Sequence, residues 1–188
     1  MNSNNPIIKH IRPEIIVKSL SQVLVFTLMM IAGAQIIIPT GITPIVLTTL
    51  FIYLAGLSIG KTKALLSTLL YVSLGLVGLP VFTAGHSGFQ HIYGPTGGYL
   101  VGFMVASWLI GFIHEKNNRT SYRLLALVCG SISIHLPGIA WMSIQFTDNW
   151  TAMKSIYWVF IIADLLKIIF ALILYKAILT FTKYTKSM

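Results

Sequence analysis

The stretch SIYWVFIIADLLKIIFALILYKAILT, residues 155–180, decides the fold class of this protein. A helix needs about 20 mostly apolar residues to cross the hydrocarbon core of a bilayer, and this run supplies them. Before Lys176, its only charged residues are Asp164 and Lys167. The stretch therefore predicts a membrane-spanning helix that carries an acid and a base in its interior.

The composition of the whole chain indicates the same class. Of its 188 residues, 56% are apolar and 9% are charged, and the mean hydropathy is +0.84. Soluble domains carry roughly 25% charged residues, so this chain has too few charges for a water-facing surface. The net charge of +9 lies at the ends of apolar runs, whereas a nucleic-acid site is a basic patch on a soluble face. The single cysteine, Cys129, excludes an intrachain disulfide and a thiolate metal site.

Apolar runs divide the chain into six predicted membrane helices, and no linker between them is long enough for a second domain. Proline and glycine mark the joints, as at Pro39, Gly60 and Pro80. We expect one all-α, polytopic transmembrane domain over residues 1–188. Its helices are expected at roughly 15–38, 45–60, 64–82, 96–114, 121–145 and 155–180.

The basic residues test this segmentation, because cytoplasmic loops of membrane proteins are enriched in lysine and arginine. With six crossings, Lys154 is the only basic residue outside, and Lys167 lies within a helix. The other basic residues all fall on the opposite side: Lys9, Arg12, Lys18, Lys61, Lys63, Lys116, Arg119, Arg123, Lys176, Lys183 and Lys186. We therefore expect a multi-pass protein of the plasma membrane, surrounded by lipid, with both termini in the cytoplasm.

A cleavable signal sequence is an alternative for the N-terminus. Basic residues, an apolar run and Ala32-Gly33-Ala34 imitate one. The run from Ile15 to Ile38 is longer than a usual signal core, and cleavage would leave five helices. We favour a first membrane helix.

Asp164 and Lys167 are the main functional clue. An ionisable residue inside a membrane helix costs about 2.5–3.5 kcal/mol on insertion scales and marks a functional site by default. Three residues apart, the two share one helical face, and Asp164 lies roughly 13 Å from the outer end of its helix. A small, mostly apolar anion with one urea- or amide-like end would satisfy both groups. The alternative is that the two charges only neutralise each other.

The outer connection GLPVFTAGHSGFQHIYGPTGGY, residues 78–99, contains six glycines and no charged residue. Glycines such as Gly85 and Gly94 allow backbone turns that a side chain forbids. Phe82, Tyr93 and Tyr99 can wall in an apolar body. This makeup favours a ligand-lining loop over an ordinary hairpin between helices.

Other polar and small residues carry weaker signals. His86 and His91 could bind a metal, but no third ligand is near in sequence, so we interpret them as polar loop residues. His135 is interpreted as a histidine of the helix bundle. Gly98 and Gly102 belong to a small-residue stripe that predicts close helix packing.

Several chemistries are excluded by missing motifs. The chain has no Gly-x-x-x-x-Gly-Lys-Ser/Thr loop for ATP and no Gly-x-Ser-x-Gly nucleophile elbow. It contains only four acidic residues. We therefore expect neither an enzyme nor a protein that hydrolyses ATP itself.

Five blocks of sequence resemble a known family in order and spacing. They are GAQIIIPTGITPIVLTTL (33–50), LAGLSIG (54–60), GLPVFTAG (78–85), GPTGGYLVGF (94–103) and ADLLK (163–167). The chain resembles the BioY family over about residues 20–175. BioY proteins are the biotin-specific S-components, or substrate-capture subunits, of energy-coupling factor (ECF) transporters.

The resemblance implies a six-helix, S-component-like bundle that binds biotin from outside with high affinity, as substrate and without a cofactor. Uptake would require a membrane-embedded coupling protein and two cytoplasmic ATPases. It also implies that the loop at 78–99 lines the site and that the stretch 35–44 acts as a lid. The expected substrate-binding residues are Gln35, Phe82, Gly85, Tyr93, Gly94, Thr96, Gly97, Gly98, Tyr99, Asp164 and Lys167. No catalytic residue and no metal ligand are expected.

The chain departs from the family pattern at three places. Ala163 stands where the family usually has glycine, and Thr48 where it usually has glutamine, so no contact is carried over to Thr48. Residues 15–31 contain no alanine for the Ala-x-x-x-Ala docking motif, which leaves the surface for the coupling protein unassigned.

Two other functions fit part of the pattern. One is an S-component for another vitamin, such as thiamin or riboflavin. The other is an autonomous ion-coupled carrier that uses Asp164 as its proton site.

Overall fold

The computed structural model describes residues 13–39, 44–145 and 150–186. It confirms the predicted all-α membrane class. Six main helices run through the described residues: α1 (Pro13–Gln35), α2 (Thr48–Ile59), α3 (Lys61–Leu76), α5 (Gly97–Lys116), α6 (Thr120–Gln145) and α7 (Trp150–Lys186). A 3₁₀ turn, η2 (Thr83–Gly85), and the short helix α4 (Phe89–Tyr93) lie between α3 and α5.

Four of these helices are long and apolar enough to cross a membrane: α1, α5, α6 and the part of α7 at Trp158–Thr182. The helices α2, with 12 residues, and α3, with 16, are shorter than the roughly 20 residues that a full crossing needs. The count of six crossings therefore stays a prediction.

A small hairpin replaces two predicted helix ends. Strands β1 (Ile37–Ile38) and β2 (Ile45–Val46) pair antiparallel, with Ile37 opposite Val46. Branched residues such as these favour strands over helices. As a result α1 ends at Gln35 rather than near residue 38, and α2 begins at Thr48 rather than near residue 45.

The third predicted helix also ends early, at Leu76 rather than near residue 82. Gly78 has a φ of +108°, a conformation that side-chain-bearing residues rarely adopt. Pro80 follows two residues later and cannot donate to a helical hydrogen bond. The chain therefore leaves the helix at this point and enters the outer loop.

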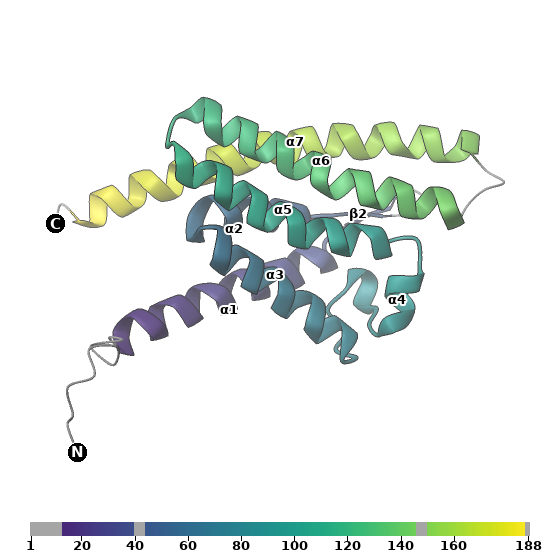
Figure 1. The fold of residues 1–188 in the computed structure, drawn as a ribbon, viewed down its shortest axis with the longest axis horizontal. Coiled ribbons are helices and arrows are strands. Elements are labelled where there is room, and N and C mark those ends of the chain that lie inside the picture. The colour runs from purple at the N-terminus through teal and green to yellow at the C-terminus, as the bar shows by residue number, and fades with distance from the viewer. Residues whose placement is uncertain (1–12, 40–43, 146–149, 187–188) are drawn as a thin grey trace, which may run out of the picture.

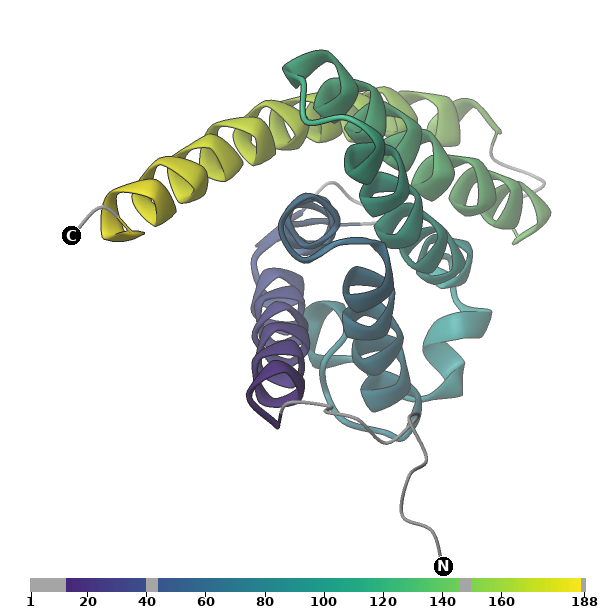
Figure 2. The same cartoon turned by 60° about the vertical axis from the view of Figure 1, so that its left-hand side comes forward.

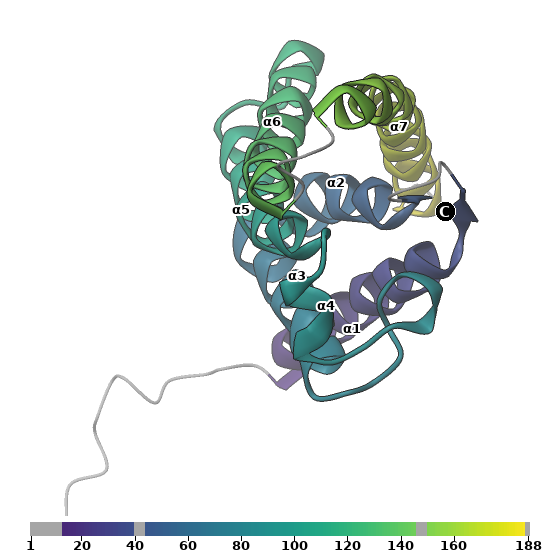
Figure 3. The ribbon, with the colours of Figure 1, turned by 90° about the vertical axis from the view of Figure 1, so that its right-hand side faces the viewer.

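Helix α2 lies at the centre of the fold. All of its residues except Phe51 and Ser58 are buried. Seen from the α4 end, α1, α3, α5 and α7 surround it (Figure 3). In Figure 2, α2 is seen end-on between α7 on one side and α1 and α3 on the other. Groups on α2 can therefore reach α7 through the core.

Glycines allow α5 and α6 to pack backbone to backbone. A Cβ on Gly98 would lie 2.3 Å from the carbonyl oxygen of Pro137, and a Cβ on Gly102 would lie 2.7 Å from the Cα of Ile134. Neither distance is compatible with a side chain. The predicted role of these two glycines in helix packing is confirmed.

The two ends of the bundle differ in character. The start of α1 and the end of α7 lie on the left in Figure 1, and α4 lies at the opposite end. At the end away from α4, Lys61 pairs with Glu115 at 3.1 Å, and Lys61 and Lys116 both lie over the ring of Phe112. The α4 end carries the uncharged loop 78–99.

Candidate ligand-binding site

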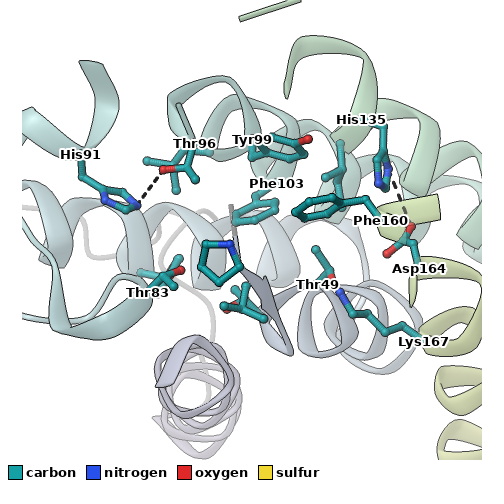
Figure 4. Close-up of a pocket in the computed structure, with 16 residues that line it drawn as sticks. Thr49, Thr83, His91, Thr96, Tyr99, Phe103, His135, Phe160, Asp164 and Lys167 are labelled. Atoms are coloured by element: carbon teal, nitrogen blue, oxygen red, sulfur yellow. Dashed lines mark hydrogen bonds and ion pairs between the residues drawn. The ribbon is translucent and has the colours of Figure 1, made fainter. Parts of the chain in front are cut away.

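A cavity lies among α2, α5, α6 and α7, at the end of the bundle that carries the outer loop (Figure 4). It has a water-accessible volume of about 60 Å³. The residues that line it are Pro44, Val46, Thr48, Thr49, Tyr71, Thr83, His91, Thr96, Tyr99, Leu100, Phe103, Ile134, His135, Phe160, Asp164 and Lys167. Four of the expected site residues, Thr96, Tyr99, Asp164 and Lys167, are thus brought together.

The carboxylate of Asp164 is held through one of its two oxygens. The residue is 2% exposed, and its Oδ2 accepts a hydrogen bond of 2.5 Å from Tyr53 Oη. Ser131 Oγ donates to the same oxygen, and His135 Nδ1 lies 3.8 Å from it. The other oxygen, Oδ1, is buried and makes no hydrogen bond to any residue that the structure describes. Buried polar atoms are normally paired, so Oδ1 is an acceptor available to a ligand.

Lys167 is anchored separately. Its Nζ donates to Thr49 Oγ1 at 2.8 Å. Thr49 and Tyr53 are four residues apart and therefore share a face of α2. This face binds both Lys167 and Asp164 and so holds the two charged side chains of α7 side by side. Within the described part of the chain, no ion pair of 4 Å or less joins Asp164 to Lys167. Mutual neutralisation by direct contact therefore does not account for the burial of the two charges.

Aromatic rings form the middle of the cavity. The rings of Tyr99 and Phe160 stack at 6.3 Å, and Tyr99 meets the ring of His135 edge to face at 6.2 Å. Figure 4 shows Phe103 and Phe160 between Asp164 and Lys167 on one side and His91 and Thr96 on the other. The cavity thus has a polar end, an apolar middle and a second polar end.

A second, outer cavity of about 340 Å³ adjoins the first. It is lined by Pro44, Thr83, Ala84, His86, Ser87, Gln90, His91, Gly94, Pro95 and Thr96. Pro44, Thr83, His91 and Thr96 line both cavities. The loop 78–99 therefore supplies most of the wall of the outer cavity, and the two cavities meet at these four shared residues.

His91 stands at the junction of the two cavities. Its Nε2 lies 3.0 Å from Thr96 Oγ1, and its ring stacks on Phe82 at 4.7 Å. Burial lowers the pKa of the His91 imidazole from its usual 6.5, and the neighbouring His86 lowers it further. His91 is therefore neutral at pH near 7. No group of three side chains able to hold a metal gathers among the described residues.

Comparison with known proteins identifies the family. The sequence model of the BioY family matches residues 3–184. This chain belongs to the BioY family. The resemblance read from the five sequence blocks is confirmed.

Two relatives of this BioY chain match about two thirds or more of its length. The biotin transporter BioY of Thermotoga maritima is 35% identical over 147 residues, which cover 78% of this chain and 87% of that protein. The probable biotin transporter BioY of Pyrococcus horikoshii is 37% identical over 126 residues, 67% of this chain and 75% of that protein.

A solved structure shares the fold of this BioY chain. It is a crystal structure at 2.1 Å of the S-component for biotin from an ECF-type ABC transporter. The two superpose with a TM-score of 0.82 and 27% sequence identity, over 91% of this chain and 95% of the other. The S-component-like bundle expected from the resemblance is therefore confirmed.

Six other expected site residues of this BioY chain line neither cavity. Phe82 is fully buried, and its ring occupies the space beside Gly75. A Cβ on Gly97 would lie 1.8 Å from the carbonyl oxygen of Ile92, so this glycine, like Gly98, is needed for packing.

The remaining three also lie outside the linings of both cavities. Tyr93 is 72% exposed, Gly85 has a φ of +73° with open space around it, and Gln35 Nε2 donates to the Phe82 carbonyl at 3.1 Å. Direct ligand contact by any of these six residues stays a prediction.

Other polar residues of the BioY site were not singled out from the sequence. Tyr53, Thr49 and Ser131 hold the charged pair, and His135, interpreted as an ordinary bundle histidine, lies on the cavity wall beside Asp164. A signal existed, because Thr49 and Tyr53, and Ser131 and His135, are polar pairs at i,i+4 in otherwise apolar segments.

Proposed function

We propose that this BioY protein captures biotin in the cavity beneath its outer loop, as the substrate-binding subunit of an ECF-type vitamin transporter. The observation that carries the proposal is the buried, unpaired Oδ1 of Asp164 beside the ammonium of Lys167. The ureido ring of biotin has N–H donors and a carbonyl acceptor, which match an aspartate oxygen and a lysine ammonium. Biotin is the transported substrate here, not a cofactor of an enzyme.

The apolar part of biotin fits the rest of the cavity. Tyr99, Phe103 and Phe160 offer aromatic faces beside the charged end, and pockets of this kind combine an apolar wall with a few placed polar groups. The names of the Thermotoga and Pyrococcus relatives and of the solved S-component point to the same substrate.

We propose that the segment 35–44 closes over the bound substrate. Residues 40–43 lie outside the described residues, and the proposal rests on the two sides of the segment. The β1–β2 hairpin ties these sides together, and Pro44 lines both cavities. Closure would exclude water and strengthen polar contacts, since electrostatic interactions increase in a low dielectric.

We propose a single domain that crosses the plasma membrane six times, with both termini in the cytoplasm. The distribution of basic residues along the sequence supports this. So does the gathering of Lys61 and Lys116 at the end opposite the uncharged loop. The sequence has no P-loop, so this chain does not bind ATP in that manner. We propose that a membrane-embedded coupling protein and two ATPases supply the energy for uptake.

Binding to the purified protein tests the proposed substrate. We expect biotin to bind at one site and to resist competition by thiamin and riboflavin. Preferential binding of either of these vitamins would contradict the assignment to biotin. Uptake into vesicles that contain this chain without any ATPase would favour an autonomous carrier instead.

A further inference from the structure

An apolar groove of about 270 Å³ lies between α6 and α7. Aliphatic side chains line most of it: Val128, Ile132 and Leu136 from α6, and Ile161, Leu165 and Ile168 from α7. Ile132 and Leu165 are 52% and 53% exposed, and both helices are long and apolar enough to cross a membrane. The groove therefore opens toward hydrocarbon, where an occupant must be apolar because unpaired polar groups are costly there.

Helical spacing connects this groove to a cation at the end of the two helices that we propose to be cytoplasmic. On α6, Arg123 is eight residues before Ser131 and twelve before His135, so the three share one face. On α7, Tyr175 is seven residues, or about two turns, beyond Ile168. The guanidinium carbon of Arg123 lies 5.1 Å from the centre of the Tyr175 ring. The seam between α6 and α7 therefore leads from the groove to Arg123.

The charge of Arg123 is not matched by an acid in the described part of the chain. Across residues 13–39, 44–145 and 150–186, its buried Nε makes no hydrogen bond, and no carboxylate pairs with its guanidinium within 4 Å. Glu115, the acid nearest in sequence, pairs with Lys61 instead. The ring beneath Arg123 is held in place, because Tyr175 Oη lies 3.0 Å from His114 Nε2. A guanidinium fixed in this way is suited to bind a phosphate through two parallel hydrogen bonds.

The distance from Arg123 to the groove matches one leaflet of a bilayer. Ile132, in the middle of the α6 wall, lies nine residues from Arg123, or roughly 14 Å at about 1.5 Å per residue. Half of the roughly 30 Å hydrocarbon core is about 15 Å. Two exposed basic residues, Arg119 on α6 and Lys176 on α7, add positive charge at the same end. Basic pockets between helices on the cytoplasmic side are typical binding sites for anionic lipid head groups.

We propose that the seam between α6 and α7 binds one anionic phospholipid of the cytoplasmic leaflet, with its phosphate at Arg123 and Arg119 and one acyl chain in the groove. The identity of the ligand at Asp164 does not bear on this site. The two sites are neighbours, however, because Ser131 lines the groove and donates to Asp164 Oδ2, and His135 lines both the groove and the binding cavity. The acyl chain thus covers, from the bilayer side, groups that surround the Asp164 carboxylate.

The test is native mass spectrometry of the purified full chain, titrated with phosphatidylglycerol, which is anionic, or phosphatidylcholine, which has no net charge. Arg123→Gln removes the cation, and Lys18→Gln is its control, because it removes one charge from an exposed position on α1. Ile132→Phe fills the groove. Ile173→Phe is the matched control, since Ile173 is 60% exposed on α7 and does not line the groove. Thermal unfolding in detergent checks the folding of each variant.

We expect the native protein and both controls to retain one phosphatidylglycerol and to prefer it roughly 25-fold over phosphatidylcholine, since each basic residue near an anionic head group contributes about a factor of five. Arg123→Gln should reduce this preference to about fivefold. Arg119→Gln, at an exposed position, should reduce it by a similar factor, so the result does not depend on Arg123→Gln folding. Ile132→Phe should weaken both lipids alike and keep their ratio, and inorganic phosphate should not displace phosphatidylglycerol.

Equal affinity of the native protein for both lipids would overturn the inference, as would an unchanged preference in both arginine variants. Lipid binding in Ile132→Phe as tight as in Ile173→Phe would remove the acyl chain from the groove. Displacement of phosphatidylglycerol by inorganic phosphate would assign Arg123 to a soluble anion. A lipid-free dimer of the native protein that dissociates in Ile132→Phe would assign the groove to a second copy of this chain. Either of the last two results would also refute the lipid site.

Discussion

Replacing Asp164 with asparagine should separate binding from folding. Asparagine keeps one side-chain oxygen, which can accept the hydrogen bonds that Tyr53 and Ser131 now donate to Oδ2. Its amide NH₂ then takes the place of Oδ1, the atom without a partner, and faces the ligand as a donor. A hydrogen bond to a charged group contributes about 1.5–3 kcal/mol. At about 1.4 kcal/mol per factor of ten, the variant should bind biotin roughly 10- to 150-fold more weakly.

The assay is titration of purified Asp164→Asn with biotin, by calorimetry or with radiolabelled ligand, together with thermal unfolding in the same detergent. The melting temperature should change little, because the variant loses a buried charge but keeps the hydrogen bonds from Tyr53 and Ser131. Glu115→Gln is the matched control: it makes the same acid-to-amide change at the opposite end of the bundle, in a pair that is more than a third exposed. It should leave biotin binding unchanged. Native affinity in Asp164→Asn would refute the assignment of Oδ1 to the ligand.

Three further predictions concern stability. Tyr53→Phe keeps the buried ring but removes the hydrogen bond to Asp164, so the free energy of unfolding should fall by about 1.5–3 kcal/mol; unchanged denaturation in detergent would count against that bond. Gly98→Ala places a methyl group against the carbonyl of Pro137 and should destabilise the protein by about 1–3 kcal/mol, whereas native stability would contradict the close packing of α5 on α6. The pKa of His91 is lowered from 6.5 in the folded state, so the unfolded chain binds more protons below that pH and stability should fall as pH decreases through about 6.5. The melting temperature should fall less in His91→Phe, and an equal fall would point to another group.

The sequence was sufficient to predict the helices and to single out the two charged residues of α7. Long apolar runs, and the rare charges within them, are direct consequences of the bilayer. It was insufficient for the β1–β2 hairpin, whose two-residue strands depend on pairing across the segment between them. It also did not predict that Tyr53 faces Asp164. Helix α2 is apolar on almost every side, and only the polar pair Thr49 and Tyr53, four residues apart, indicates which face meets α7.

The position of the Phe82 ring could not be predicted from the sequence either. An aromatic residue in a glycine-rich loop is expected to face a ligand, but the absence of a side chain at Gly75 opens a space in the core that its ring fills. Such a match between distant residues arises only when the helices are assembled. Loop composition alone therefore identified the segment that lines the outer cavity, but not the orientation of each side chain in it.

A structure of the protein with biotin bound tests the central claim most directly. We expect a ureido nitrogen within hydrogen-bonding distance of Asp164 Oδ1 and the ureido oxygen beside Lys167 Nζ. Biotin bound elsewhere would contradict the account, for example in the groove of about 270 Å³ between α6 and α7 that is lined by Val128 and Leu165 and shares His135 with the binding cavity. So would biotin in the cavity with its ureido ring turned away from Asp164.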